Sequence, residues 1–334
     1  MSFDSVFIIT MIIVILALSF DFINGFHDTA NAIATSVSTK ALRPRVAILM
    51  AASMNFLGAM TFTGVAKTIT KDIVNPFDLE NGSIVIMAAL ISAIIWNLVT
   101  WYFGIPSSSS HALIGSIAGA AIAASGFAIL NYKGFIKIIQ ALIFSPLIAF
   151  VVGFSIYFLF KIFFKNFNLA KTNKRFRYLQ IGTAAIQSYT HGTNDAQKAM
   201  GIITMALMAN NYHMTDDIPF WVQFSCATAM GLGTSIGGWK IIKTVGGKIM
   251  KIRPVNGVAA DISSAMIIFG ATFIHLPVST THVISSSILG VGASHRVKGV
   301  KWNTAQRMLI TWVITLPITS VLAAACYLIL NLFM

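Results

Sequence analysis

The chain has 334 residues, of which 56% are hydrophobic and only 10% are charged, whereas soluble domains carry about 25% charged residues. This composition excludes a soluble enzyme, a nucleic-acid binder and a disordered scaffold, and the length suits about ten membrane crossings of about 20 residues each. The net charge of +13 therefore has to be explained by where the basic residues lie. Cys226 and Cys326 both lie in apolar stretches, so neither a disulfide framework nor a metal-ligand spacing is expected.

The apolar stretches predict the membrane segments. In chain order they fall near residues 6–36, 45–66, 84–103, 109–130, 138–164, 178–208, 220–240, 257–276, 280–294 and 305–332. The first is long for a single span and is interrupted by polar residues from Asp21 to Asp28. The third and fourth, and the eighth and ninth, are joined by short turns that contain Pro106 and Pro277. Such breaks are tolerated at membrane depth only where the backbone is buried in protein or lines a wet cavity.

The basic residues predict the orientation. They cluster near residues 40–45, 161–177, 240–253 and 295–307, whereas loops 67–83 and 209–219 carry acidic residues. The positive-inside rule places the four basic clusters in the cytoplasm. Both termini then lie outside, provided that each proline-turn pair enters and leaves on the same side. A patch that binds anionic lipid or collects phosphate is the functional alternative for these clusters.

The chain also repeats itself with an offset near 170 residues. Asn24–Ala32 matches His191–Ala199, and Pro106–His111 matches Pro277–His282. The first motif runs inward and its copy runs outward, so the two halves are inverted repeats. Inverted repeats with paired broken segments are typical of secondary transporters, whose site lies near the midplane where the repeats meet.

We therefore predict an all-α polytopic membrane protein with re-entrant-type hairpins and roughly 10–12 transmembrane segments or half-helices. Residues 1–160 form the first repeat, 161–177 a basic cytoplasmic linker and 178–334 the second repeat. The chain has no phosphate-binding loop of the Gly-x-x-x-x-Gly-Lys-Ser/Thr type, so transport by its own ATP hydrolysis is unsupported. A membrane-embedded hydrolase would need a nucleophile or a metal cluster that the repeat does not predict, so we expect no enzyme and no metal centre.

Four acidic residues lie within the apolar stretches: Asp21, Asp28, Asp195 and Asp261. A carboxylate at the bilayer centre costs at least about 2.5–3.5 kcal/mol, so each needs a partner or a task. Asp28 and Asp195 occupy matched positions beside Asn31 and Asn194. A carboxylate with amide and hydroxyl oxygens nearby suits sodium and can equally carry a proton. We also expect a functional role for Asp261, whereas pairing between helices explains Asp21 equally well.

Tracts of hydroxyl residues follow both prolines, and each tract begins an apolar helix. The N–H groups at a helix start carry partial positive charge and the hydroxyls add donors, so two facing helix starts would bind a tetrahedral oxyanion. Capping explains one hydroxyl per helix but not a tract in both repeats. The predicted anion contacts are Ser107, Ser108, Ser109, Ser279, Thr280, Thr281, Asn31 and Asn194.

Lys198 stands where the first repeat has Asn31. It would pair with a carboxylate such as Asp195, replace a coupling cation or contact the substrate, while snorkelling to the membrane surface is the structural alternative. The histidines of the motifs either relay protons or anchor helices by hydrogen bonds. They are His27, His111, His191 and His282.

These motifs resemble those of a known family. Gly25–Ala32 and Gly192–Ala199 are similar to the duplicated Gly-Ala-Asn-Asp-Val-Ala-Asn signature of the inorganic phosphate transporter (PiT) family, and the proline–hydroxyl runs resemble its hairpin motifs. The resemblance covers essentially the whole chain. It implies a homodimeric symporter of inorganic phosphate in the cell membrane, with protons or sodium as coupling ion and no covalently bound cofactor. A sodium ion would lie near Asp28, Asn31 and Asp195.

Two departures from the signature bear on the coupling ion. His27 replaces the first Asn of the signature, and Gln197 and Lys198 replace the second Ala-Asn. Both features resemble bacterial low-affinity members that are proton-coupled and move phosphate complexed with a divalent metal. We therefore expect proton coupling, with sodium coupling or another oxyanion such as sulfate as alternatives. The expected coupling residues are Asp28, Asp195, Lys198, His27 and Asp261.

Overall fold

The computed structural model describes residues 3–79 and 81–333, which form twelve α-helices and three short 3-10 turns. The α-helices are α1 (Phe3–Ser38), α2 (Pro44–Ala59), α3 (Gly64–Asp72), α4 (Gly82–Phe103), α5 (Ser109–Ser125), α6 (Tyr132–Phe164), α7 (Leu169–Ala209), α8 (Phe220–Ile236), α9 (Trp239–Gly247), α10 (Pro254–Phe273), α11 (Thr280–Arg296) and α12 (Trp302–Asn331). The 3-10 turns are η1 (Pro76–Asp78), η2 (Phe127–Ile129) and η3 (Val297–Gly299). The predicted all-α polytopic fold is confirmed.

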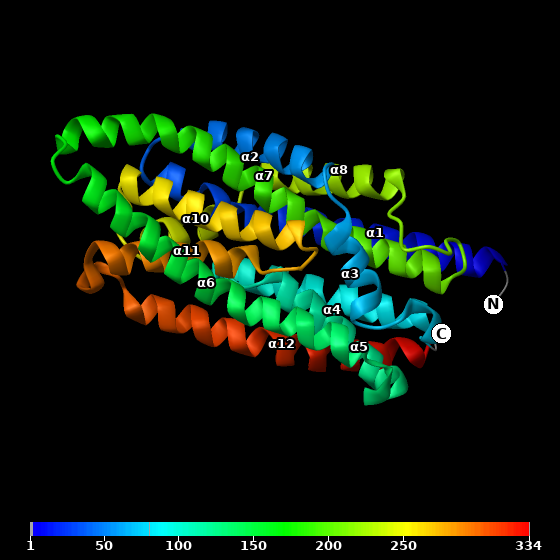
Figure 1. The fold of residues 1–334 in the computed structure, drawn as a ribbon. Coiled ribbons are helices and arrows are strands. Elements are labelled where there is room, and N and C mark those ends of the chain that lie inside the picture. Colours follow the sequence, from blue (N-terminus) through cyan, green and yellow to red (C-terminus); the bar gives the residue numbers. More distant parts are fainter. Residues whose placement is uncertain (1–2, 80, 334) are drawn as a thin grey trace.

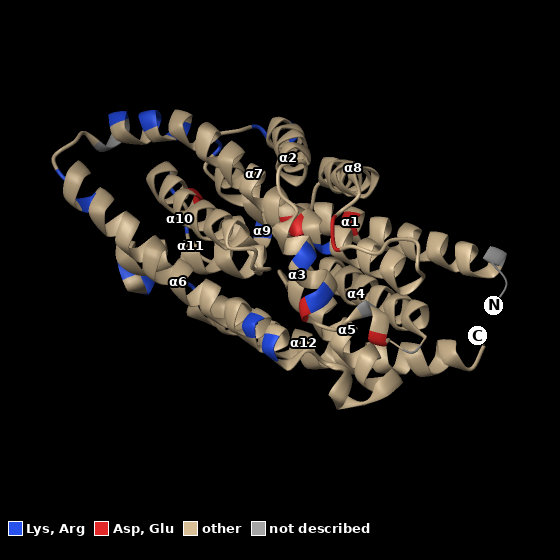
Figure 2. Ribbon diagram, turned by 45° about the vertical axis from the view of Figure 1, so that its right-hand side comes forward, with Lys and Arg blue, Asp and Glu red and all other residues tan. Residues whose placement is uncertain are grey.

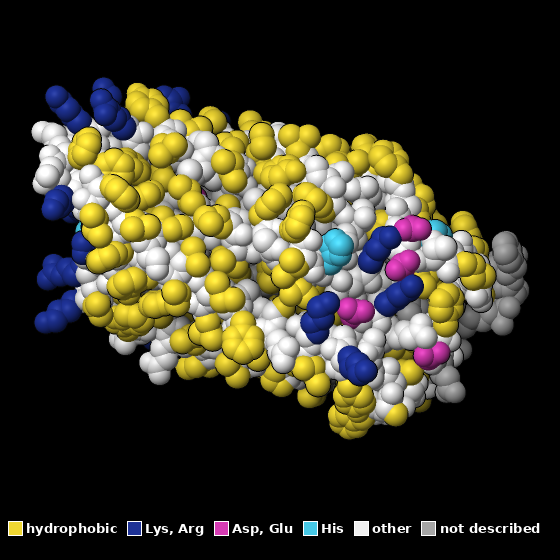
Figure 3. Space-filling view, in the orientation of Figure 1, with side chains coloured by type: hydrophobic (Ala, Val, Ile, Leu, Met, Phe, Trp, Pro, Cys, Tyr) yellow, Lys and Arg dark blue, Asp and Glu magenta, His cyan; other side chains and the backbone are white. Residues whose placement is uncertain are grey.

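The helices lie side by side in an elongated bundle, and both termini lie at the same end of it (Figure 1). We call this the terminal end. α1 runs away from the terminal end, whereas α7 runs toward it (Figure 1). Lys and Arg gather at the opposite end, which we call the basic end (Figures 2 and 3).

The surface and length of the helices identify a multi-pass membrane protein. Five described helices are long and apolar enough to cross a membrane, and the bent pair α2–α3 makes a sixth candidate. The two helices of that pair meet at an angle of 67°, so the predicted stretch 45–66 is broken near its end. Large apolar side chains lie exposed along α6 and α12, as expected for helices that face lipid.

The first predicted stretch differs from the expectation, because α1 is one unbroken helix of 36 residues. Several of its polar side chains, among them Asp28, Asn31 and Thr35, bond across to neighbouring helices and so do not compete with the helix backbone. Gly25 is required by close packing on α8: a Cβ atom there would lie 2.4 Å from the carbonyl oxygen of Met230. α1 can therefore carry a polar site at mid-length without being broken.

Two helical hairpins enter the bundle from opposite ends. α4 begins and α5 ends at the terminal end, whereas α10 begins and α11 ends at the basic end (Figure 1). Their turns, 104–108 and 274–279, contain Pro106 and Pro277. The turns meet inside the protein, where Ser110 Oγ of the first hairpin donates a hydrogen bond of 2.8 Å to the carbonyl oxygen of Val278 in the second.

The apolar core has two parts with a polar layer between them. Along α1, Ile9 to Phe20 belong to one buried apolar cluster and Ala30 to Ala34 belong to the other. The intervening turns carry the buried polar residues of the first motif. The bundle therefore encloses polar chemistry at mid-length, shielded at both ends by packed apolar side chains.

α6 packs against α11, and α12 packs against α5, so the last helix of each half covers the hairpin helix of the other half. Matched glycines allow these close contacts. A Cβ atom at Gly119 would lie 2.1 Å from the carbonyl oxygen of Ser320, and one at Gly290 would lie 2.0 Å from that of Phe150. The repeat in the sequence is thus a repeat of packing.

Gly290→Ala tests this packing. The added methyl group forces α6 and α11 apart, and overpacking of this kind costs about 1–3 kcal/mol. We expect a clearly lower melting temperature of the purified protein in detergent. Gly270→Ala is the matched control, because a Cβ atom there meets nothing within 4 Å. Equal melting temperatures for the two variants would show that the α6–α11 contact is looser than described.

Candidate substrate and coupling site

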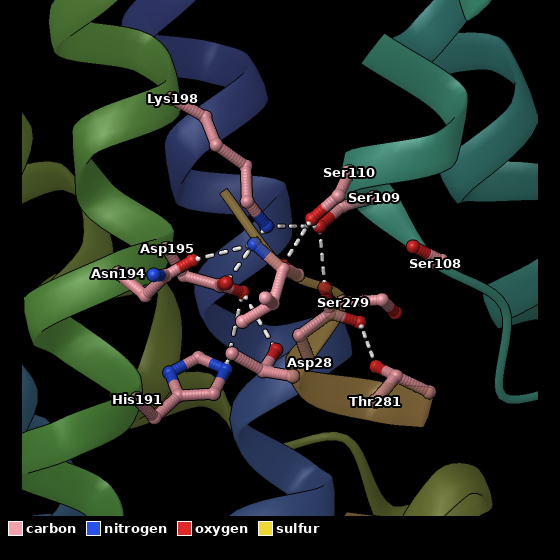
Figure 4. Close-up of polar contacts among 12 residues, drawn as sticks. Asp28, Ser108, Ser109, Ser110, His191, Asn194, Asp195, Lys198, Ser279 and Thr281 are labelled. Carbon is pink, nitrogen blue, oxygen red and sulfur yellow. Dashed lines mark hydrogen bonds and ion pairs between the residues drawn. The ribbon is translucent and has the colours of Figure 1, made fainter. Parts of the chain in front are cut away.

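The hairpin turns bring the starts of α5 and α11 against the middle of α1 and α7 (Figure 4). The predicted residues Ser108 and Ser279 cap these helices. Ser108 Oγ accepts from the backbone N–H of His111 at 3.1 Å, and Ser279 Oγ accepts from that of His282 at 3.3 Å. Each cap fixes the direction of its helix start. The residues that follow are thereby aimed at the two carboxylates.

Asp28 binds hydroxyls from both hairpins. Ser109 Oγ donates to its Oδ2 at 2.5 Å, and Thr281 Oγ1 donates to its Oδ1 at 2.9 Å. Asn31, one turn further along α1, donates from Nδ2 to Thr281 Oγ1 at 2.8 Å. A single carboxylate on α1 therefore holds the tips of both hairpins together.

Asp195 on α7 binds a hydroxyl of the second hairpin directly and is linked to the first hairpin through Lys198. Thr280 Oγ1 donates to Asp195 Oδ2 at 3.1 Å. Lys198 Nζ lies 2.7 Å from Asp195 Oδ1 and donates to Ser109 Oγ at 2.9 Å. His191 Nε2 lies 3.3 Å from Asp195 Oδ2. Lys198 is only 1% exposed, so the snorkelling alternative is wrong: its ammonium lies inside the site.

His27 connects Asp28 to the first hairpin. Its Nδ1 lies 2.7 Å from Asp28 Oδ1, and its Nε2 lies 3.1 Å from Thr100 Oγ1. Thr100 Oγ1 also accepts from Ser107 Oγ at 2.8 Å and is 3.0 Å from the carbonyl oxygen of Trp96. A threonine hydroxyl has one hydrogen to donate. If it points to Trp96, Nε2 of His27 must be the donor, and if it points to Nε2, His27 is neutral.

The remaining predicted residues lie around this centre. Asn194 does not bond to the hydroxyls at the starts of α5 and α11: its Nδ2 donates to Thr272 Oγ1 of α10 at 3.0 Å, and its Oδ1 accepts from the backbone N–H of Val278 at 3.2 Å. It therefore shapes the second turn. Asp261 lies apart, two turns of α1 nearer the basic end, where it accepts from Thr35 at 2.7 Å and from Thr183 at 2.9 Å.

The two hairpin histidines meet each other rather than the carboxylates. The rings of His111 and His282 are 4.5 Å apart, and His282 stacks on Trp312 with ring centres 4.0 Å apart. His111 Nδ1 lies 2.9 Å from Ser108 Oγ. This geometry agrees with the role of a packed, hydrogen-bonded anchor between the hairpins.

Sequence reasoning missed two polar residues that organise the site. Thr100 contacts Nε2 of His27. Asn55 on α2 contacts both α1 and α7, the helices that carry the two signature motifs. Asn55 Nδ2 donates to Thr29 Oγ1 at 2.8 Å, and its Oδ1 lies 3.1 Å from His191 Nδ1. Each lies among only a few polar residues within an apolar helix. That isolation, which makes a buried partner necessary, is the signal that would have found them.

The site is closed to solvent in this conformation. The four central residues, Asp28, Ser109, Asp195 and Lys198, are each at most 1% exposed. The described part of the chain contains no group of three or more His, Cys, Asp or Glu residues arranged to hold a metal ion. The site contains buried carboxylates, hydroxyl donors and one ammonium group beside two helix starts. Together these groups suit the binding of a small anion and a coupling cation.

This fold, with its closed polar site between two hairpins, defines a membrane transporter for a small anion. Residues 24–323 match the phosphate transporter family, and the chain belongs to that family. It is 78% identical over 330 residues to a probable low-affinity inorganic phosphate transporter of Bacillus subtilis (strain 168), a match that covers 98% of this chain and 99% of the relative.

Other relatives agree. The chain is 44% identical over 317 residues to a probable low-affinity inorganic phosphate transporter of Rhizobium meliloti (strain 1021), with 94% of each chain covered. It is also similar to a solved structure described as the sodium-dependent phosphate transporter, with a TM-score of 0.84, 26% identity, and 98% of this chain and 100% of the other covered. The resemblance to the phosphate transporter family is thus confirmed, and the protein is a transporter and not an enzyme.

Ser109→Ala tests the geometry of the centre. The change removes a hydroxyl that donates a hydrogen bond to Asp28 and accepts one from Lys198. Hydrogen bonds to charged groups contribute about 1.5–3 kcal/mol, so phosphate uptake by proteoliposomes should fall at least about tenfold. Ser125→Ala, at the exposed end of the same helix, should leave uptake unchanged. Equal uptake by both variants would contradict the role given to Ser109.

Proposed function

We propose that this phosphate transporter imports inorganic phosphate together with protons by alternating access. The observation that carries the proposal is the position of Lys198. Its ammonium bridges Asp195 and Ser109, with 2.7 Å and 2.9 Å to the respective oxygens. A positive charge that belongs to the protein occupies the place where a symmetric site would bind a second sodium ion.

The phosphate would bind at the two helix starts. Backbone N–H groups at the beginning of α5 and α11 carry the positive ends of the helix dipoles. The hydroxyls of Ser109, Thr280 and Thr281 already point into the same space, where they donate to carboxylates. When phosphate enters, these hydroxyls turn from the carboxylates to the phosphate oxygens, while Lys198 neutralises part of its charge.

His27 and Asp28 would carry the coupling proton. Because the Thr100 hydroxyl can turn either way, Nε2 of His27 can be a donor or an acceptor, so the His27–Asp28 pair can gain or release a proton without moving a heavy atom. An added proton on this pair weakens the hold of Asp28 on Ser109 and Thr281, and so frees both hydroxyls for phosphate. Proton and phosphate then favour each other's binding. Asp195 and Asp261 are further carboxylates for this task.

Sodium coupling is the second candidate. Asn31 Oδ1 is buried and has no hydrogen-bond partner among the described residues, and together with Asp28 it offers the hard oxygen ligands that sodium prefers. The similar solved structure is described as sodium-dependent. Sodium would then bind near Asp28 and Asn31 only, because Lys198 already neutralises Asp195.

The charge distribution supports the orientation. Lys and Arg gather at the basic end (Figure 3), so this end would face the cytoplasm and both termini would lie outside the cell membrane. α1 and α7 run in opposite directions (Figure 1), which supports two inverted repeats that alternately open the site to either side. The homodimer, and phosphate carried as a metal complex, rest on the family resemblance alone.

Phosphate uptake by proteoliposomes under an imposed pH gradient, without sodium, tests the coupling ion. Each coupled proton gains about 1.4 kcal/mol per pH unit, which supports about tenfold accumulation. We expect phosphate to accumulate when the outside is more acidic, and to do so equally with and without added sodium. Uptake that needs sodium and ignores the pH gradient would contradict proton coupling. Repeating the assay with and without magnesium distinguishes free from metal-complexed phosphate.

A further inference from the structure

Three wholly buried polar residues lie beside the site without a hydrogen bond of normal geometry. They are Asp21, Asn24 and Asn97, each 0% exposed. Among the described residues, neither carboxylate oxygen of Asp21 and neither polar atom of the two amides makes a hydrogen bond of normal geometry, although the Asn24 side chain lies near enough to the Asp21 carboxyl to interact with it. Each buried, unsatisfied polar group costs about 1–3 kcal/mol. A cluster of them marks a place where something binds.

The cluster lies between the central site and the terminal end. Asp21 precedes Asp28 by seven residues, so it lies on the same face of α1 about 10 Å away. Asn24 precedes His27 by three residues, and Asn97 precedes Thr100 by three. Because His27 and Thr100 are in contact at 3.1 Å, the two amides lie one turn beyond that contact on neighbouring helices.

The backbone of Lys198 on α7 lies at about the same height along the bundle as Asp21 on α1. α1 and α7 are antiparallel neighbours, and Asn210 Nδ2 donates to Thr10 Oγ1 at 2.9 Å. Twelve residues back from Asn210 is Lys198, and twelve residues on from Thr10 is Phe22. The Lys198 backbone therefore lies beside Asp21, and its side chain extends inward from there to Asp195 and Ser109.

Few other ionisable groups face Asp21. On α7, the charges of Lys198 and Asp195 act on the Asp21 carboxyl, and on α8 the thiol of Cys226 lies near it. α4 contributes Asn97, which does not titrate. The charged residues of α9 and α10 lie along the other half of α1, where Asp261 binds Thr35. Apart from its burial, the protonation of Asp21 therefore depends on the charges of Asp195 and Lys198, and of these two groups Lys198 has the longer and more flexible side chain.

An isolated buried carboxylate is stable only when it is protonated or paired with a cation. In this structure the ammonium of Lys198 is bonded to Asp195 and Ser109, so the stable form of Asp21 here is the neutral acid. If Asp21 lost its proton, Lys198 would be the nearest positive charge. Its flexible four-carbon stem allows the ammonium to swing from one carboxylate toward the other.

We propose that Asp21, with Asn24 and Asn97, forms a second proton-binding site that controls the phosphate site through Lys198. The inference rests on the proposed proton–phosphate symport. With a proton on Asp21, Lys198 stays on Asp195 and Ser109 and is available to phosphate. When that proton leaves, the Asp21 carboxylate draws the ammonium away, and the phosphate site loses its cation. One proton is bound and released, and no other covalent bond changes.

Asp21→Asn imitates the protonated form permanently, which makes the inference testable. Binding of labelled phosphate to the purified protein is measured from mildly acidic to mildly alkaline pH. Relative to Asp21→Asn, the wild type should lose at least about fivefold in affinity as pH rises, since the ionisation of phosphate itself is common to both. Asp21→Asn should keep the acid-pH affinity and still exchange phosphate across proteoliposomes, but an imposed pH gradient should drive clearly less net accumulation than in the wild type, because only the proton of the His27–Asp28 pair remains coupled.

Three further variants sharpen the result. Asp21→Glu retains a carboxyl group and should retain coupling. Asp21→Ser, which is also uncharged, should behave as Asp21→Asn and replaces it if that variant is not recovered folded. Asp78→Asn, which changes an exposed carboxylate at the end of the 3-10 turn η1, should behave as wild type.

Wild-type pH dependence in Asp21→Asn would overturn the inference. So would a folded Asp21→Asn protein that binds no phosphate at any pH, because that outcome would indicate a purely structural or direct substrate role. A wild-type protein that ignores the pH gradient would overturn the symport proposal and this inference with it. A coupled wild type with an equally coupled Asp21→Asn would overturn this inference alone.

Discussion

The structure depends on the neutralisation of two carboxylates buried in the middle of a membrane bundle. Asp28 and Asp195 are at most 1% exposed, so the protein itself must supply the hydrogen bonds and charges that water would supply at a surface. It does so with hydroxyls at the tips of two hairpins, with His27 and with Lys198. Because these partners come from both halves of the chain, neutralising the carboxylates also joins the halves.

This arrangement links three properties of the transporter. In the proposed mechanism the hydroxyls that stabilise the carboxylates also donate to phosphate, so phosphate and the carboxylates would compete for them. A proton on a carboxylate would weaken the hydrogen bonds that it accepts from these hydroxyls. The same hydroxyls cross-link α1 and α7 to α5 and α11, so a change of protonation also changes how firmly the hairpins are held. Binding, coupling and movement would thus share one set of hydrogen bonds, with the ammonium of Lys198 as the cation among them.

Much of this was predictable because the chain repeats itself. The paired motifs identified Asp28, Asp195 and the hydroxyl tracts, and the scarcity of charge identified a membrane bundle. The individual contacts were not predictable, because they depend on the direction in which each hairpin turn aims its helix. Ser108 and Ser279 therefore cap helices, and Asn194 shapes a turn. Asn55 and Thr100 were missed because neither belongs to a motif, and their partners are set by how α2 and α4 pack. The continuity of α1 was also missed, since polar residues such as Asp28 and Asn31 find partners on other helices.

The central claim is that Asp28 joins the two hairpins and makes phosphate transport depend on protons. The most direct measurement compares net uptake with phosphate exchange in Asp28→Asn, reconstituted in proteoliposomes and shown by gel filtration to be folded. The amide cannot take up a proton between mildly acidic and mildly alkaline pH, and it binds the hydroxyls of Ser109 and Thr281 less strongly than a carboxylate does. We expect uptake driven by a pH gradient to be abolished. A folded Asp28→Asn protein that accumulates phosphate at the wild-type rate would contradict it.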